Sequence, residues 1–292
     1  MRRTRRSLAA VAALVLAILI GALAAPAPAA AAPTRADSKG RPVYFVHGYA
    51  GSGGHDCTAY WATAFARLRQ QGSSGGFTTW GYYGEDSRCT VEYNGNRDTS
   101  LNVLAKELAW SIYAYHSSYG RSIDVVAHSM GGLIVRRAIA GADRNESGYP
   151  PELYVEDVVT LGTPHDGTNW ARGCAPRDYQ CEQMITGSAF LTWLNQYVSN
   201  PQSDGGTDWS VIGSDADSTV AGSKAIDMSA GPKYRYRENE GIDHSGLIQH
   251  GSLNSTFDLD WWHWNGPRSG FNPNGQSVLV VTANALYRWS TW

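Results

Sequence analysis

Short apolar runs alternate with amphipathic segments along most of this chain. Continuous apolar runs rich in β-forming residues predict buried strands, and apolar residues spaced three and four apart predict the helices that cover them. The strands predicted in this way are 42–46, 77–83, 121–127, 155–161, 209–213 and 234–237. The predicted helices are 58–71, 101–115, 130–140, 188–197 and 277–289.

This alternation of strands and helices predicts an α/β fold with a mostly parallel sheet covered on both faces. Ligands of such sheets bind beyond the carboxyl ends of the strands. The stretch 265–276 has the Gly/Ser/Asn/Pro composition of a linker, but too few residues follow it to form another domain. We therefore predict one domain over residues 42–292, with an aromatic C-terminal extension from about residue 251.

The segment 124–133 has the pattern of a nucleophile elbow. Its apolar strand ends abruptly at Ser129, and Gly131, Gly132 and a helical pattern follow. A serine on such a sharp strand-to-helix turn holds its hydroxyl clear of both elements. Ala127 stands where the usual pattern has a glycine, which is a mild departure. An ordinary strand–turn–helix with a capping serine gives the same pattern. The polar clusters elsewhere in the sequence are therefore needed to distinguish a catalytic elbow from an ordinary turn.

A serine nucleophile needs a base to take its proton and an acid to orient that base. Serine, acid and then histidine is the chain order found where such an elbow is catalytic. Two aspartates follow the strand at 209–213, and we favour Asp217 because Val220, three residues on, would anchor its loop in the core. Asp215 stays open as the alternative, since an aspartate there also suits a turn.

His244 is the predicted base because it follows the strand at 234–237, after the acid. His165 precedes the acid and is expected to shape the wall of the site. His250 and His263 are expected to be surface or packing residues, and His128 to be structural. Acyl transfer also needs donors aimed at the developing oxyanion. We assign the backbone N–H groups of Met130 and Tyr49 to this role.

Four segments, in this order, resemble the secreted bacterial lipases and esterases of the α/β-hydrolase superfamily, and most closely the class 2 lipases of actinobacterial type. These segments are 46–48, 127–132, 161–165 and 187–191. The resemblance covers about residues 42–250. It implies an α/β-hydrolase fold and ester hydrolysis without a cofactor or metal. It also implies a triad of Ser129, Asp217 and His244, with Tyr49 and Met130 at the oxyanion hole.

The expected substrate is a triacylglycerol or a similar apolar ester. An apolar acyl pocket could be lined by the residues Tyr49, Met130, Leu191 and Trp193 and by the aromatic tail (Trp261, Trp262, Trp264). Most of these side chains could equally belong to the core. Other predicted possibilities are a phospholipase, a polyester depolymerase, an acyltransferase or a non-catalytic cell-envelope binding protein.

The first 32 residues have the features of a secretory signal peptide: an arginine-rich start, an apolar stretch and small residues. A retained membrane anchor is the rival interpretation, but the alanine-rich, proline-broken end favours cleavage. Residues 33–41 are predicted to be a linker. Removing residues 1–32 takes away four of the 24 Lys and Arg residues and none of the 26 Asp and Glu residues. The formal charge then changes from −2 to −6. We expect a secreted monomer that does not stay in the membrane and does not bind nucleic acid.

Four cysteines in an exported chain favour disulfides. We predict the pairs Cys57–Cys89 and Cys174–Cys181, because each pair would then close one local insertion. A zinc site is the alternative, but no two of these cysteines have C-x-x-C spacing.

Overall fold

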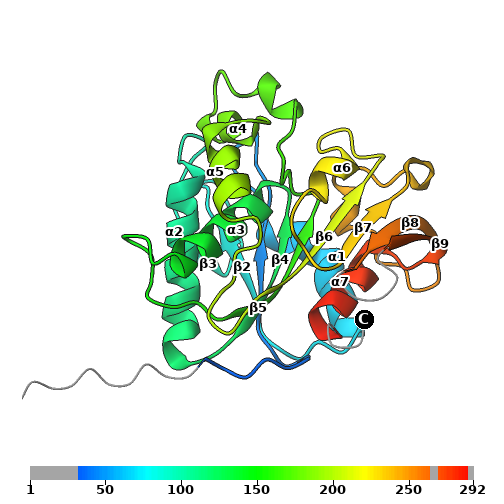
Figure 1. Cartoon of the computed structure of the whole chain (residues 1–292), viewed down its shortest axis with the longest axis horizontal. Helices are drawn as coiled ribbons and strands as arrows, with labels where there is room; N and C mark the ends of the chain where they lie inside the picture. The colour runs from blue at the N-terminus through cyan, green and yellow to red at the C-terminus, as the bar shows by residue number, and fades with distance from the viewer. Residues whose placement is uncertain (1–31, 264–268, 289–292) are drawn as a thin grey trace, which may run out of the picture. The chain divides into compact units, whose positions relative to one another are not determined.

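A nine-stranded sheet runs through the part of the chain that this computed structural model describes, residues 32–263 and 269–288 (Figure 1). The strand order is β3-β2-β1-β4-β5-β6-β7-β8-β9. Neighbouring strands are parallel from β3 to β7, and β8 and β9 are antiparallel. The strands are β1 (Val43–Val46), β2 (Phe77–Gly81), β3 (Val91–Glu92), β4 (Ile123–His128), β5 (Val155–Leu161), β6 (Asp208–Ser214), β7 (Lys233–Tyr236), β8 (Phe257–Trp262) and β9 (Ser269–Gly275).

Helices cover both faces of the sheet (Figure 1). One face packs against α2 (Leu101–Tyr115), α3 (Met130–Asp143) and α5 (Ala189–Tyr197). The other face packs against α1 (Cys57–Gln70) and α7 (Val278–Tyr287). The shorter helices are α4 (Tyr179–Met184), α6 (Gly222–Ala225), η1 (Ser117–Tyr119), η2 (Trp170–Gly173), η3 (Glu238–Glu240) and η4 (Gly246–Ile248).

The burial pattern of β1 shows why this layering forms. All four residues of β1 are fully buried. Side chains alternate between the faces of a strand, so Val43 and Phe45 join the core beneath α1 and α7, whereas Tyr44 and Val46 join the core beneath α2 and α3. A strand that is apolar at every position therefore needs a helix layer on each side.

The C-terminal region differs from the sequence prediction. The strand at 234–237 was expected to be the last, but β8 and β9 extend the sheet beyond it, and residues 269–275 of the supposed linker form β9. Strand β9 lies at the edge of the sheet and is largely exposed, so it needs no apolar alternation. An edge strand also tolerates Pro273, which would interrupt pairing in a central strand. The short strand β3 lies between the predicted strand at 77–83 and the predicted helix at 101–115, where no strand was predicted.

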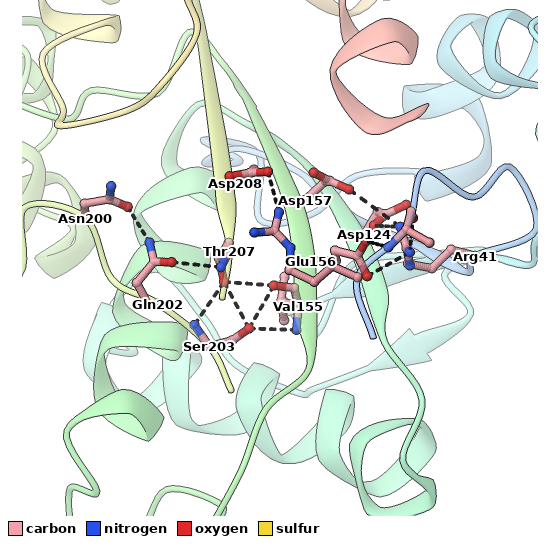
Figure 2. A network of polar contacts seen from close by, with 12 residues as sticks. Arg41, Asp124, Val155, Glu156, Asp157, Asn200, Gln202, Ser203, Thr207 and Asp208 are labelled. Atoms are coloured by element: carbon pink, nitrogen blue, oxygen red, sulfur yellow. Dashed lines mark hydrogen bonds and ion pairs between the residues drawn. The ribbon is translucent and has the colours of Figure 1, made fainter. Parts of the chain in front are cut away.

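Buried charges gather at the amino ends of the central strands. Asp124 of β4 and Asp157 of β5 are register partners, and so are Asp157 and Asp208 of β6. Arg41 lies beside them: its guanidinium is 3.0 Å from Asp124, 2.7 Å from Glu156 and 3.6 Å from Asp157 (Figure 2). We call Arg41, Asp124, Glu156 and Asp157 the amino-edge cluster; all four are buried. Residues 33–41, predicted to be a linker, thus contribute a cation to the sheet.

Part of the predicted secretion signal, residues 1–31, lies outside the described residues, as does Trp264. Among the residues that are described, no helix combines the length and apolar character that a membrane crossing requires.

Candidate active site

Ser129 lies on a sharp turn between β4 and α3. Its backbone has φ 54° and ψ −131°, a conformation that non-glycine residues rarely adopt. A Cβ on Gly131 would lie 2.4 Å from the carbonyl oxygens of Val46 and His47, so only glycine lets α3 start this close to β1. The Ser129 N–H donates to the Leu161 carbonyl at 2.8 Å, which fixes the turn to β5.

The side chains of Ser129, His244 and Asp217 form one chain of hydrogen bonds. The Ser129 Oγ lies 2.8 Å from His244 Nε2, and His244 Nδ1 lies 2.6 Å from Asp217 Oδ2. The second carboxylate oxygen of Asp217 accepts the backbone N–H groups of Thr219 and Val220 at 2.8 and 2.9 Å. Asp217 is therefore held by its own loop while it contacts His244.

Asp215 lies elsewhere. Its carboxylate is 3.5 Å from Arg235 and partly exposed, and burial raises its pKa. The Val220 N–H holds the Asp217 carboxylate, and the Val220 side chain is buried. Of the two candidate aspartates, Asp217 is the one in contact with His244.

The remaining histidines lie away from the Ser129 hydroxyl or face other partners. His165 is fully buried with its Nε2 3.0 Å from the Thr160 hydroxyl, and Pro164 rather than His165 lines the pocket beside Ser129. His250 packs against Phe257, and His263 lies 3.0 Å from the Tyr234 hydroxyl. These placements agree with packing roles.

The loop after β1 runs directly beside Ser129. A Cβ on Gly48 would lie 2.8 Å from the Cβ of Ser129, so a larger residue here would collide with the nucleophile. The neighbouring amides are engaged, since Gly48 N–H donates to the Tyr60 hydroxyl and Ala50 N–H to the Tyr83 hydroxyl. Met130 is the first residue of α3, where backbone N–H groups have no partner within a helix. The positions of Tyr49 and Met130 thus suit the predicted oxyanion donors.

Comparison with known proteins finds one family model and several solved structures that are similar to parts of this chain. Residues 37–173 match the PGAP1-like alpha/beta domain family. Similar solved structures include Bacillus licheniformis lipase BlEst2 in mature form, with 20% identity, 62% of this chain and 68% of that chain covered, and a TM-score of 0.41. Aspergillus fumigatus lipase B has 15% identity, 73% and 50% coverage, and a TM-score of 0.49. The chain thus spans half of the Aspergillus protein. None of the curated proteins matches this sequence.

A parallel sheet with a serine elbow after β4, an acid after β6 and a histidine after β7 decides the fold. The chain has the α/β-hydrolase fold. The predicted fold class is confirmed, and the polar clusters that follow the strands meet at one edge of its sheet.

In this α/β-hydrolase fold, a network missed by the sequence analysis supports the loop after β1. The carboxylate of Asp86 accepts hydrogen bonds from the backbone N–H groups of His55, Tyr82 and Tyr83 and lies 3.0 Å from His47 Nε2. Burial alone would raise the pKa of Asp86, but these hydrogen bonds outweigh it and lower the pKa. The Tyr82 hydroxyl donates to the carbonyls of His47 and Gly48 at 2.8 and 2.7 Å. Asp86 lies in a polar stretch with no distinguishing motif, so its role was not evident.

A pocket of about 140 Å³ opens beside Ser129 and His244. Its walls are mostly apolar and come from several loops, η2 and the end of α4: Tyr49, Pro164, Thr168, Trp170, Met184, Thr219 and Val220. Of the residues expected to line an acyl pocket that the structure describes, only Tyr49 does so. Leu191 and Met130 are buried in the core, Trp193 lines another cavity, and Trp261 and Trp262 lie on β8.

The insertion that carries Met184 is fastened to the rest of the α/β-hydrolase fold. The Tyr49 hydroxyl donates to Asp178 at 2.5 Å, and the Tyr83 hydroxyl donates to Gln180 at 2.6 Å. Burial, then the contact with Asp178, raises the pKa of Tyr49. On the other side of α4 lies a separate cavity of about 670 Å³, lined in part by Ile185 and Trp193. Helix α4 is therefore a fixed wall between two cavities.

Both disulfides join the predicted partners, Cys57 to Cys89 and Cys174 to Cys181. The first ties the start of α1 to the loop before β3, and the second closes the insertion between η2 and α4. All four cysteines are used in this way, which excludes the alternative of a cysteine zinc site. Within residues 32–263 and 269–288, no group of His, Cys, Asp and Glu side chains is arranged to hold a metal ion.

Proposed function

We propose that this protein is a secreted serine hydrolase that cleaves carboxylic esters through an acyl-enzyme on Ser129. One observation carries the proposal: the hydrogen-bonded chain from the Ser129 hydroxyl through His244 to Asp217. A serine becomes a useful nucleophile only when such a base and orienting acid accompany it.

In the proposed reaction the Ser129 Oγ attacks the ester carbonyl carbon while His244 Nε2 takes the hydroxyl proton. The N–H groups of Tyr49 and Met130 donate to the oxyanion of the tetrahedral intermediate. Collapse of this intermediate breaks the bond to the alkoxy oxygen, and His244 returns the proton to the leaving alcohol. Water then attacks the acyl-enzyme with His244 as base, which releases the acid and restores Ser129. Asp217 holds His244 in the tautomer with its proton on Nδ1.

The pocket limits the acyl group that this site accepts. Its walls are mostly apolar and offer little to a charged or sugar-like substrate, which favours an aliphatic acyl chain. A cavity of roughly 150 Å³ holds one benzene molecule, so a pocket of about 140 Å³ has room for about six carbon atoms. We therefore propose esters of short, apolar acids as the preferred substrates, with triacylglycerols of short chains among them.

Secretion is part of the proposal because two features support it together. The chain begins with the pattern of a signal peptide, and its two disulfides require an oxidising compartment. The resemblance to secreted class 2 lipases agrees with this location, and the similarity in fold to structures titled lipases agrees with the reaction.

A fluorophosphonate probe tests the proposal. The mature protein should be labelled at Ser129, located by peptide mass spectrometry, whereas Ser129→Ala should lose labelling and about 10⁶-fold in kcat. Folding of the variant is checked by circular dichroism. A folded wild-type protein that does not react with the probe would contradict the assignment and favour the non-catalytic binding protein.

A panel of substrates then separates the enzymatic alternatives. Simple esters with acyl chains of two to sixteen carbons, a phospholipid, a polyester film and an added alcohol acceptor test the four activities side by side. We expect the highest kcat/KM for simple esters of about four to six carbons, as the pocket volume indicates.

A further inference from the structure

A second hydrogen-bonded chain lies behind the candidate triad and joins two loops of the active site. The backbone N–H of Gly48 donates to the Tyr60 hydroxyl at 3.2 Å. The Tyr60 hydroxyl lies 2.6 Å from Nδ1 of His128, and Nε2 of His128 lies 2.9 Å from the backbone carbonyl of His244. Gly48 precedes the predicted oxyanion donor Tyr49, so the chain links the oxyanion loop to the loop that carries the base.

The partners fix the direction of each hydrogen bond in this chain. A carbonyl oxygen only accepts, so Nε2 of His128 must carry a proton and donate it to the His244 carbonyl. In a neutral imidazole Nδ1 is then an acceptor, so the Tyr60 O–H donates to it. The Tyr60 oxygen in turn accepts the N–H of Gly48. Every donor and acceptor along the path is used once, and such chains strengthen their members mutually.

The surroundings keep both side chains in the required protonation states. His128 is buried, and burial together with the neighbouring His244 lowers its pKa well below the usual range. The ring centres of His128 and His244 are 4.6 Å apart, so a charge on His128 would oppose the imidazolium that forms on His244 during attack. Burial raises the pKa of Tyr60, which keeps its hydroxyl proton available to donate.

The geometry points to Tyr60 and His128 as positioning residues that hold the oxyanion loop and the His244 loop in register with Ser129. This inference rests on the proposed function. Neither side chain lines the pocket beside Ser129, so their effect is transmitted through the backbone of Gly48 and His244. A misplacement of about 1 Å in such a site costs about 100-fold in rate.

The first test is Tyr60→Phe, which removes one oxygen atom and both of its hydrogen bonds. We expect kcat on a short-chain ester to fall about 10- to 100-fold with KM little changed, because the loss falls on the transition state. The rate of fluorophosphonate labelling should fall in parallel. Tyr236→Phe is the matched control: this buried tyrosine of β7 also donates a hydrogen bond, at 2.6 Å to the Gln276 carbonyl. It should lower the thermal midpoint without changing kcat.

Two substitutions of His128 test its two hydrogen bonds separately, the one with Tyr60 and the one with the His244 carbonyl. His128→Gln can keep a donor near Nε2 for the His244 carbonyl, and His128→Asn can keep an acceptor near Nδ1 for Tyr60. We expect each to retain more activity than His128→Ala. Once His128 is alanine, the further change Tyr60→Phe should cost less than it does alone, because the two residues act through one chain.

A spectroscopic measurement on the wild-type protein covers the case in which these variants do not fold. With ¹⁵N-labelled histidine, His128 should be neutral at pH 7 with its proton on Nε2. Assignment of the proton to Nδ1, or wild-type kcat in a folded Tyr60→Phe variant, would overturn the positioning role and leave the proposed function intact. If Ser129 of the wild-type protein does not react with the probe, the proposed function itself fails, and this inference fails with it.

Discussion

The two ends of the central strands differ in how their buried polar groups are paired. At the carboxyl edge, Ser129, His244 and Asp217 lie in one directional chain of hydrogen bonds, and the Asp217 carboxylate accepts two further backbone amides. At the amino edge, three buried carboxylates share one buried arginine. Neither oxygen of Asp157 accepts a hydrogen bond from any residue that the structure describes.

This difference separates the chemistry of the protein from its stability. Burial raises the pKa of Asp124 to about 7 and that of Asp157 well above its usual range, and repulsion from the neighbouring carboxylates adds to the effect of burial. At the carboxyl edge, the hydrogen-bonded chain from Ser129 contains a single carboxylate, that of Asp217, among the residues that the structure describes. Substitutions at the carboxyl edge should therefore change rates, and substitutions at the amino edge should change the free energy of unfolding.

The largest effect is expected for Asp217→Asn. Loss of the carboxylate favours the wrong tautomer of His244, and kcat should fall about 10⁴-fold with little change in thermal stability. Asp215→Asn is the matched control and should stay within about threefold of the wild-type kcat. Equal losses in the two variants would show that Asp217 does not act through His244.

Next comes Arg41→Met, which removes the cation of the amino-edge cluster. Leaving buried carboxylates without a partner should lower the free energy of unfolding by about 3–5 kcal/mol, measured by urea denaturation. Arg121→Met, at an exposed arginine, should change it by no more than about 0.5 kcal/mol. At low temperature the folded Arg41→Met protein should keep its kcat; a large loss of kcat would mean that the two edges are coupled.

A smaller, pH-dependent change in the free energy of unfolding is expected for Asp157→Asn. The folded protein retains a proton on the Asp124–Asp157 pair up to about pH 7, whereas the unfolded chain releases it near pH 4. The folded state therefore binds more protons in this window, and wild-type stability should fall as the pH rises from about 4 to 7. Asp157→Asn should flatten this slope and be more stable by about 1–2 kcal/mol at pH 8. Identical slopes in the two proteins would refute the shared proton.

The smallest effect concerns the pocket wall. Met184→Ala should enlarge the space beside Ser129 and raise kcat/KM for eight-carbon relative to four-carbon acyl esters about 10-fold, or about 1.4 kcal/mol. Ile185→Ala, the next residue, faces the other cavity and should leave this ratio unchanged. The same shift in both variants would indicate loosening of α4 rather than a specific wall.

The strand-and-helix pattern predicted the fold because most strands of the sheet are apolar and buried. The strands that the pattern did not predict are β3, β8 and β9. Strand β3 has only two residues, β9 is largely exposed, and β8 lies in the stretch taken for an aromatic extension. The sequence pattern predicted no strand between 83 and 101, and the composition of 265–276 suggested a linker. At an edge, pairing with one neighbour is sufficient, so sequence there is weakly constrained.

The candidate triad could be predicted because each member follows a strand in a fixed chain order. The catalytic roles of Ser129, Asp217, His244, Tyr49 and Met130 stay predictions that the labelling and substitution experiments test. The hydrogen bonds that hold the loops around these residues could not be predicted, since Asp86 and Tyr60 come from distant segments without a motif. Pocket-lining residues were missed for the same reason: Thr219 and Met184 meet only in three dimensions.

The disulfide between Cys174 and Cys181 also bears on how the proposed acyl preference could be altered. The segment that this disulfide closes reaches the pocket through Met184 at the end of α4, whereas the reacting groups follow the ends of strands. With the anchoring residues Asp178 and Gln180 kept, Met184 is the position in this segment where substitutions can test the proposed acyl preference without changing the reacting groups.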